Sequence, residues 1–157
     1  MACAAALAVL HAMEAERIPE RAQRMGDRIS SRFREWAGRF PCIGDVRGLG
    51  AMVGMELVVD RSSKTPDKAL TTRFLTAALE RGLVLLSSGT FGNVVRVLAP
   101  LTAQEAIIDE GLAVMESALA VAVSGSMESR AAGAAASAAP RFASRARSTR
   151  STHHPTT

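Results

Sequence analysis

Seven apolar side chains recur at intervals of three or four residues through residues 18–40 of the chain. This spacing places them on one face of an α-helix and leaves the opposite face polar. We therefore predict a helix over residues 20–39 that buries one side against a second layer of structure. The seven residues are Ile18, Ala22, Met25, Ile29, Phe33, Trp36 and Phe40.

The sequence after this helix predicts the second layer as a small sheet. Short runs rich in Val, Ile, Leu and Met are separated by turn residues, with glycines at 48–50 permitting a tight turn. Helices packed on one small, mainly antiparallel sheet make an α+β domain. The expected strands and extended pieces are residues 43–47, 51–58, 83–86 and 94–98.

Two local signals indicate where later helices begin. Thr65 supplies a capping hydroxyl before Pro66, which predicts a helix from there to about Arg81, with Gly82 as its stop. Residues 102–105 have the spacing of a capping box, which predicts a last helix. The expected inner faces are Leu70, Phe74, Ala77 or Ala78, and Leu79 in the first, and Ile107, Ile108, Gly111, Leu112, Met115 and Leu119 in the second.

The two ends of the chain differ from this body. Residues 2–15 predict an Ala-rich helix that is apolar on nearly every side over 2–9, so it needs cover that the chain does not supply. Residues 124–157 contain no Leu, Ile or Val, and they carry the whole net charge of +4. Such a segment buries too little apolar surface to offset the entropy of ordering, so we expect disorder there.

Most residue types that carry chemistry lack partners. The aromatic content of 4% argues against a nucleic-acid module built on stacking platforms. Cys3 and Cys42 form no metal motif, and we expect Cys42 to be a packed thiol in a reducing, cytoplasmic setting. His11, His153 and His154 have no neighbours that would complete a triad or a metal site. The opening segment is too short to span a membrane.

The cationic side chains are more informative. Lys64 and Lys68, the only lysines, lie in or beside a polar loop, where no apolar pocket would lower the pKa of an amine for covalent catalysis. Arg96 lies in an otherwise apolar β-run, and an unpaired buried guanidinium would be costly. It therefore pairs with Glu56, faces solvent at a sheet edge, or binds a carboxylate from outside through its planar fork.

These segments resemble a known family. Residues 43–52, 81–83, 89–96 and 100–101 are similar in order and spacing to the C-terminal part of class III pyridoxal-phosphate-dependent aminotransferases. Residues 2–10 resemble the helix that follows the Gly-Gly-Asn-Pro segment of that family. Within it, the pattern is most similar to 4-aminobutyrate aminotransferases, and ornithine and other ω-amino-acid enzymes share much of it.

The resemblance implies fold-type I architecture and a division of the chain into three parts. Residues 1–17 would be the helix leading from a large domain, 18–122 the C-terminal small domain, and 123–157 a disordered tail. It also implies amino transfer from 4-aminobutyrate to 2-oxoglutarate, with Arg96 binding a substrate carboxylate.

The same resemblance implies that this chain lacks the residues that bind the cofactor. In the family, the cofactor lysine, the aspartate on the pyridine nitrogen, the stacking aromatic and the phosphate-binding residues all precede this region. We therefore expect that the chain alone neither holds pyridoxal 5'-phosphate nor transaminates.

Alternative functions remain open at this stage. The chain could be a small interaction domain that keeps the aminotransferase subunit-contact surface, forming a dimer with itself or with an intact homologue. A transaminase for another ω-amino acid such as ornithine is a further alternative. A nucleic-acid partner ranks far behind, because the arginines of the tail form no dense block, and no membrane partner is expected.

Overall fold

The computed structural model describes residues 2–137 as helices around a four-stranded sheet. The helix predicted over 20–39 and its preceding Ala-rich helix are both present. The helices are α1 (Ala2–Ala15), α2 (Ile18–Arg39), α3 (Lys68–Leu79) and α4 (Glu105–Ser137). The strands are β1 (Ile43–Leu49), β2 (Met52–Leu57), β3 (Ser87–Ser88) and β4 (Val94–Leu98).

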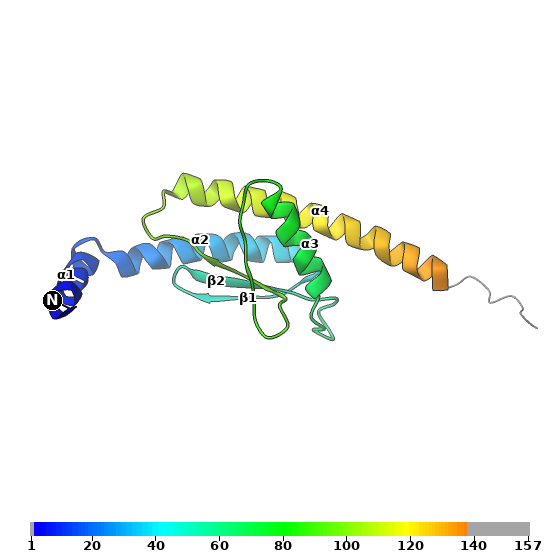
Figure 1. Cartoon of the computed structure of the whole chain (residues 1–157), viewed down its shortest axis with the longest axis horizontal. Coiled ribbons are helices and arrows are strands. Elements are labelled where there is room, and N and C mark those ends of the chain that lie inside the picture. Colours follow the sequence, from blue (N-terminus) through cyan, green and yellow to red (C-terminus); the bar gives the residue numbers. More distant parts are fainter. Residues whose placement is uncertain (1, 138–157) are drawn as a thin grey trace, which may run out of the picture.

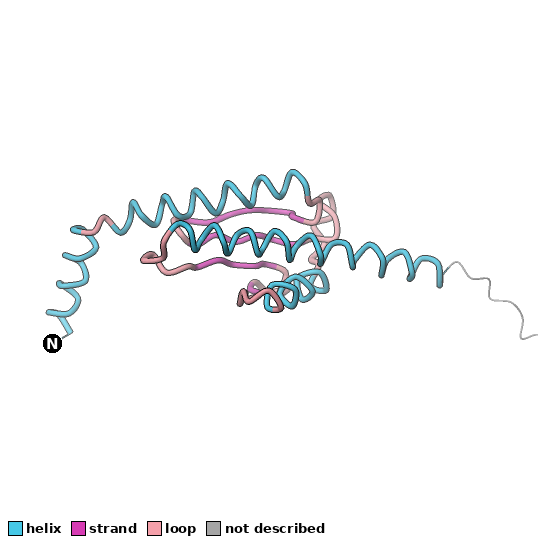
Figure 2. Tube along the Cα trace, turned by 90° about the horizontal axis from the view of Figure 1, so that it is seen from above, coloured by secondary structure: helices cyan, strands magenta, loops and turns pink. Residues whose placement is uncertain are grey.

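The sheet is antiparallel throughout, with strand order β1-β2-β4-β3. The register of β1 on β2 is irregular between Ile43 and Asp45 and regular from there to the turn. Helices α2 and α4 lie on the same side of the sheet (Figure 1), and the view from above shows them running along the strands (Figure 2). The expected α+β architecture of helices on a small antiparallel sheet is confirmed.

The apolar face of α2 forms the centre of the core, as its spacing predicts. Ile29, Phe33 and Trp36 are fully buried, and the rings of Phe33 and Trp36 lie 5.2 Å apart between centroids. The Trp36 Nε1 donates a hydrogen bond to Glu116 of α4 at 2.9 Å, which satisfies the indole at the edge of the core. Gly26, on the same helix, lies directly against the backbone of Gly50 in the β1–β2 turn.

The start of α3 differs from the prediction. The helix begins at Lys68, and Asp67 rather than Thr65 is its cap: the Asp67 side chain accepts a hydrogen bond from the Leu70 amide at 2.8 Å. The Thr65 carbonyl instead accepts from the Val59 amide at 2.8 Å, so this segment belongs to the edge of the sheet. The inner face is also shorter than expected, because the helix ends at Leu79, which is 61% exposed.

The run at 83–86 is not a strand, contrary to the prediction. Its burial alternates, with Leu83 and Leu85 partly buried and Val84 and Leu86 exposed. Hydrogen-bonded pairing with β4 is confined to Ser87 and Ser88. The alternation of apolar residues at 83–86 therefore reflects which side chains are buried in an extended segment, and not pairing in the sheet.

The last helix begins later and ends later than predicted. It starts at Glu105, so the capping box expected at 102–105 is wrong, and Ile107 on its predicted inner face is 58% exposed. It continues to Ser137, so the structure describes residues 123–137 of the expected tail as helix. Ala, Met, Glu and Arg are strong helix formers, so a segment with too few apolar residues to build a core can still form a helix. The rest of the predicted tail, 138–157, lies outside the described residues.

The first helix has no buried residue, as the expectation of missing cover predicts. Its apolar side chains Leu7, Val9 and Leu10 are each more than half exposed. In both views α1 bends away from α2 and leaves the body of the domain (Figures 1 and 2).

Candidate functional site

One face of the sheet packs on the helices, and the opposite face, here called the outer face, is formed by three rows of side chains. The antiparallel register sets the rows, since directly paired residues share a face. Leu49, Met52 and Leu98 form an apolar row, with exposed fractions of 82%, 44% and 65%. The second row is Arg47, Gly54 and Arg96, and the third is Asp45, Glu56 and Val94.

Arg96 is exposed on the outer face. Its neighbours in sequence, Val95 and Val97, point to the helix side, where Val95 is fully buried. Within residues 2–137, the Arg96 guanidinium forms no ion pair or hydrogen bond. Of the alternatives that the sequence left open, the structure therefore has the solvent-facing arginine and not the pair with Glu56.

Glu56 is bound to Arg47 instead. The Arg47 Nη1 donates to Glu56 Oε2 at 2.7 Å and to Asp45 Oδ2 at 2.6 Å. The hydrogen bonds that Arg47 donates to Glu56 and to Asp45 raise the pKa of its guanidinium, so Arg47 stays charged at any ordinary pH. One of the two arginines on the outer face is thus neutralised and the other is free.

Asn93, to which the sequence analysis assigned no role, supports this arrangement. It is 2% exposed, and its Nδ2 donates to the Leu57 carbonyl at 2.9 Å and to Glu56 Oε1 at 3.3 Å. Its own carbonyl accepts from the Leu57 amide at 2.8 Å, which joins the start of β4 to the end of β2. The available signal was an amide side chain immediately before an apolar strand, a position where a buried polar group needs a fixed partner.

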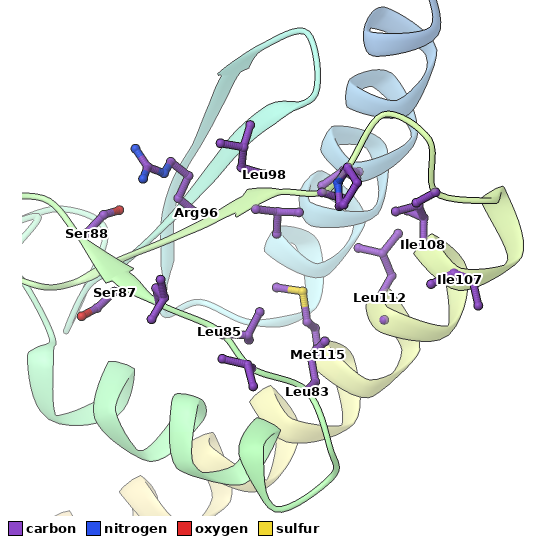
Figure 3. Close-up of a pocket in the computed structure, with 18 residues that line it drawn as sticks. Leu83, Leu85, Ser87, Ser88, Arg96, Leu98, Ile107, Ile108, Leu112 and Met115 are labelled. Carbon is purple, nitrogen blue, oxygen red and sulfur yellow. The ribbon is translucent and has the colours of Figure 1, made fainter.

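A pocket of about 600 Å³ lies between β4, the extended run at 83–88 and the first turns of α4, and Arg96 is among the residues that line it. Its lining is mainly aliphatic, including Leu85, Leu112 and Met115. Figure 3 shows the Arg96 guanidinium pointing away from these side chains, beside Ser88. Arg96 therefore lines the pocket, while its guanidinium points away from the aliphatic side chains.

The two lysines lie as the sequence predicts. Lys64 and Lys68 are both exposed, in the loop and at the first position of α3. Neither amine is desolvated, so neither has the environment that a covalent attachment site for an aldehyde cofactor needs. The residues that the structure describes therefore do not fit covalent binding of pyridoxal 5'-phosphate.

The remaining candidates are also located. Cys42 is partly buried, and this burial raises the pKa of its thiol, as expected for a packed thiol. His11 is exposed on α1, and His153 and His154 lie outside the described residues. Across 2–137, no group of acidic, His and Cys side chains could hold a metal ion. Nor does any helix in that range have the length and apolar character needed to cross a bilayer.

Comparison with known proteins identifies the fold. The family described as Aminotransferase class-III matches residues 1–119. The chain belongs to this family. Among curated relatives, the 5-aminovalerate aminotransferase of Pseudomonas putida is 46% identical over 120 residues, which cover 76% of this chain and 28% of the relative. The 4-aminobutyrate aminotransferase of Escherichia coli is 42% identical over 115 residues, covering 73% and 27%. The resemblance stated from the sequence is confirmed.

Solved structures agree with the sequence relatives. The ω-transferase of Vibrio fluvialis JS17 has a TM-score of 0.68 at 29% identity, covering 80% of this chain and 30% of that one. An amine transaminase from an uncultivated Pseudomonas species, solved in its PLP-bound form, has a TM-score of 0.66 at 31% identity, covering 77% and 27%. The chain thus spans little more than a quarter of the length of the curated relatives it matches.

Proposed function

We propose that this chain is the small-domain part of a transaminase for an ω-amino acid of the 4-aminobutyrate type, and that Arg96 binds the substrate carboxylate. The observation that carries the proposal is the free, exposed guanidinium on the outer face, while the neighbouring Arg47 is neutralised. Relatives named for 4-aminobutyrate and 5-aminovalerate support the substrate class. We further propose the division into 1–17, 18–122 and 123–157, with α4 crossing the last boundary.

The chemistry of these substrates suits an arginine. Each of these substrates carries a carboxylate that does not react. In 4-aminobutyrate and 5-aminovalerate it lies at the end opposite the amine, and 2-oxoglutarate has carboxylates besides its reacting ketone. A guanidinium binds a carboxylate through two parallel hydrogen bonds, which fixes its orientation as well as its position. Such a contact would position the substrate and would not itself move a proton, because arginine stays protonated.

We also propose that the chain alone neither holds pyridoxal 5'-phosphate nor transaminates. That cofactor supplies the electron sink for amino transfer in the family when bound. The proposal is supported by the exposed positions of Lys64 and Lys68, which leave both amines solvated. The free Cys3 and Cys42 thiols support a cytoplasmic location.

The carboxylate contact is tested by titrating the chain with 2-oxoglutarate while following the Nε–H signals of its arginines by NMR. We expect the Arg96 signal to shift and the response to be lost in Arg96→Gln. Arg34→Gln removes another exposed arginine, on α2, and serves as the matched control. An unchanged titration in Arg96→Gln would refute the assignment.

The cofactor proposal has its own test. The chain is incubated with pyridoxal 5'-phosphate, desalted, reduced with borohydride and mapped by peptide mass spectrometry, with the full-length P. putida relative as the positive control. We expect coenzyme on a lysine of the relative and none retained on this chain. Coenzyme retained on Lys64 or Lys68, together with transamination by the purified chain, would contradict the proposal.

A second function is favoured by the exposed apolar surface. The apolar row of the outer face and the uncovered helix α1 suit an interaction domain that associates with itself or with an intact homologue. Light scattering after size exclusion, with and without the P. putida enzyme, tests this. Association supports it, and a lone monomer in both samples counts against it.

A further inference from the structure

The outer face places one carboxylate between two arginines. Gly54 of β2 pairs with Arg47 on one side and with Arg96 on the other. Glu56 lies two residues along β2 on the same face, so it is a diagonal neighbour of both arginines. Diagonal neighbours in an antiparallel sheet are about 7–8 Å apart, within the reach of long side chains. Glu56 could therefore pair with either guanidinium.

The structure commits Glu56 to one side. Both of its carboxylate oxygens are engaged, Oε2 by Arg47 at 2.7 Å and Oε1 by Asn93 at 3.3 Å. The Glu56 side chain is 27% exposed and that of Arg47 is 54% exposed, so the pair lies at the surface and not in the core. The Glu56 carboxylate has two polar partners, Arg47 and Asn93, so its placement depends on these hydrogen bonds.

The charges of the cluster make Arg47 decisive. With Arg47 present, two carboxylates, Asp45 and Glu56, share one arginine, and Arg96 has no partner within residues 2–137. Without Arg47, Arg96 is the one guanidinium of the outer face on a strand next to Glu56. A carboxylate and a guanidinium within reach form charge-assisted hydrogen bonds in preference to remaining separate. Asp45, on β1, is one strand farther from Arg96.

We propose that Arg47 is a positioning residue that holds Glu56 away from Arg96 and so keeps the Arg96 guanidinium available to an incoming carboxylate. The last part rests on the proposed function, whereas the competition of two arginines for Glu56 stands on the sheet geometry alone. In this arrangement Asn93, immediately before β4, holds the second oxygen of Glu56 at 3.3 Å. A residue that never touches the substrate thus sets the charge that the substrate meets.

The test measures how fast phenylglyoxal modifies each arginine of the full chain, read by peptide mass spectrometry. This reagent reacts with free guanidinium groups, and an ion pair protects them. In Arg47→Gln we expect Glu56 to pair with Arg96 and the Arg96 rate to fall by about two- to fivefold, the range that an exposed ion pair supplies. In the double variant Arg47→Gln with Glu56→Gln, the Arg96 rate should return to that of the unmodified sequence.

Two further variants separate positioning from a general structural effect. Arg47→Lys keeps a cation on β1 and should leave the Arg96 rate unchanged. Arg28→Gln removes an ion-paired arginine far from the outer face, on α2, and should also leave it unchanged. An Arg96 rate that is the same in Arg47→Gln as in the unmodified chain overturns the proposal, as does a double variant that stays slow.

Glu56→Gln alone keeps the proposal testable if Arg47→Gln fails to fold. This variant should raise the modification rate of Arg47 and leave that of Arg96 unchanged. A higher modification rate at Arg96 would show that Glu56 already pairs with Arg96, which overturns the proposal. The labelling uses no carboxylate ligand. Its outcome is therefore distinct from the 2-oxoglutarate titration, which tests the proposed function by itself.

Discussion

Replacing Gly26 with alanine is expected to destabilise the domain, although alanine is the better helix former. A β-carbon at Gly26 would lie 1.8 Å from the Gly50 carbonyl oxygen and 2.5 Å from its carbon. Both are backbone atoms, and Gly50 has a φ of 52° that fixes the tight turn, so neither group can swing aside. Helix α2 and the β1–β2 turn must separate.

The magnitude follows from two opposing effects. Alanine gains about 1 kcal/mol over glycine in a helix interior. Overpacking of a well-filled site costs about 1–3 kcal/mol, and a clash with backbone belongs at the upper end of that range or beyond it. We therefore expect Gly26→Ala to lower the free energy of unfolding by about 2 kcal/mol. Urea denaturation followed by circular dichroism measures this difference.

Gly38 on the same helix is the matched control. No heavy atom lies within 4 Å of a β-carbon built there. Gly38→Ala should therefore raise the free energy of unfolding by about 0.5–1 kcal/mol, the usual preference for alanine in a helix. If Gly26→Ala is as stable as the unmodified chain, or if both variants change stability in the same direction, the close approach of α2 to the turn is wrong.

Three other changes test separate parts of the fold. Hydrogen bonding with Arg39 lowers the pKa of Glu116 below the ordinary value of 4.5. The stabilisation that Glu116 gives is therefore present above pH 4.5 and is lost as the pH falls through the lower pKa of the folded state. Glu116→Gln should flatten the acid limb of a plot of melting temperature against pH. Lys64 has a φ of 52°, so Lys64→Gly should stabilise the chain by about 0.5–1 kcal/mol in urea denaturation, and a loss would refute the strain. Asp67→Ala should cost about 1 kcal/mol by removing the cap of α3, whereas Thr65→Ala should cost clearly less; the reverse order would restore Thr65 as the cap.

The parts of the fold that the sequence predicts well depend on long, regular patterns. The apolar stripe on α2 contains seven residues spaced three or four apart, and Ile29, Phe33 and Trp36 on it are buried as the spacing predicts. The apolar run at 94–98 is likewise a strand, as predicted. Such patterns average over many residues, so one exception does not change the result.

The features that the sequence did not predict depend on single contacts between distant residues. Thr65 and Asp67 are both good capping residues, and the choice was made by the hydrogen bond from Val59 to Thr65, which is set by the sheet. The role of Arg96 is similar. Its freedom depends on Arg47 holding Glu56, and only the register of β1 on β2 brings those two side chains together.

Strand β1 is an outermost strand of the sheet, so among the described residues one of its sides has no partner strand, although Arg61 donates to the Ile43 carbonyl at 2.9 Å. Such an edge invites stacking with other chains into fibrils. The register irregularity between Ile43 and Asp45 breaks the flat template, and the opposite charges of Asp45 and Arg47 would meet their like in any in-register stack. The same ion cluster that orders the outer face thus also discourages polymerisation.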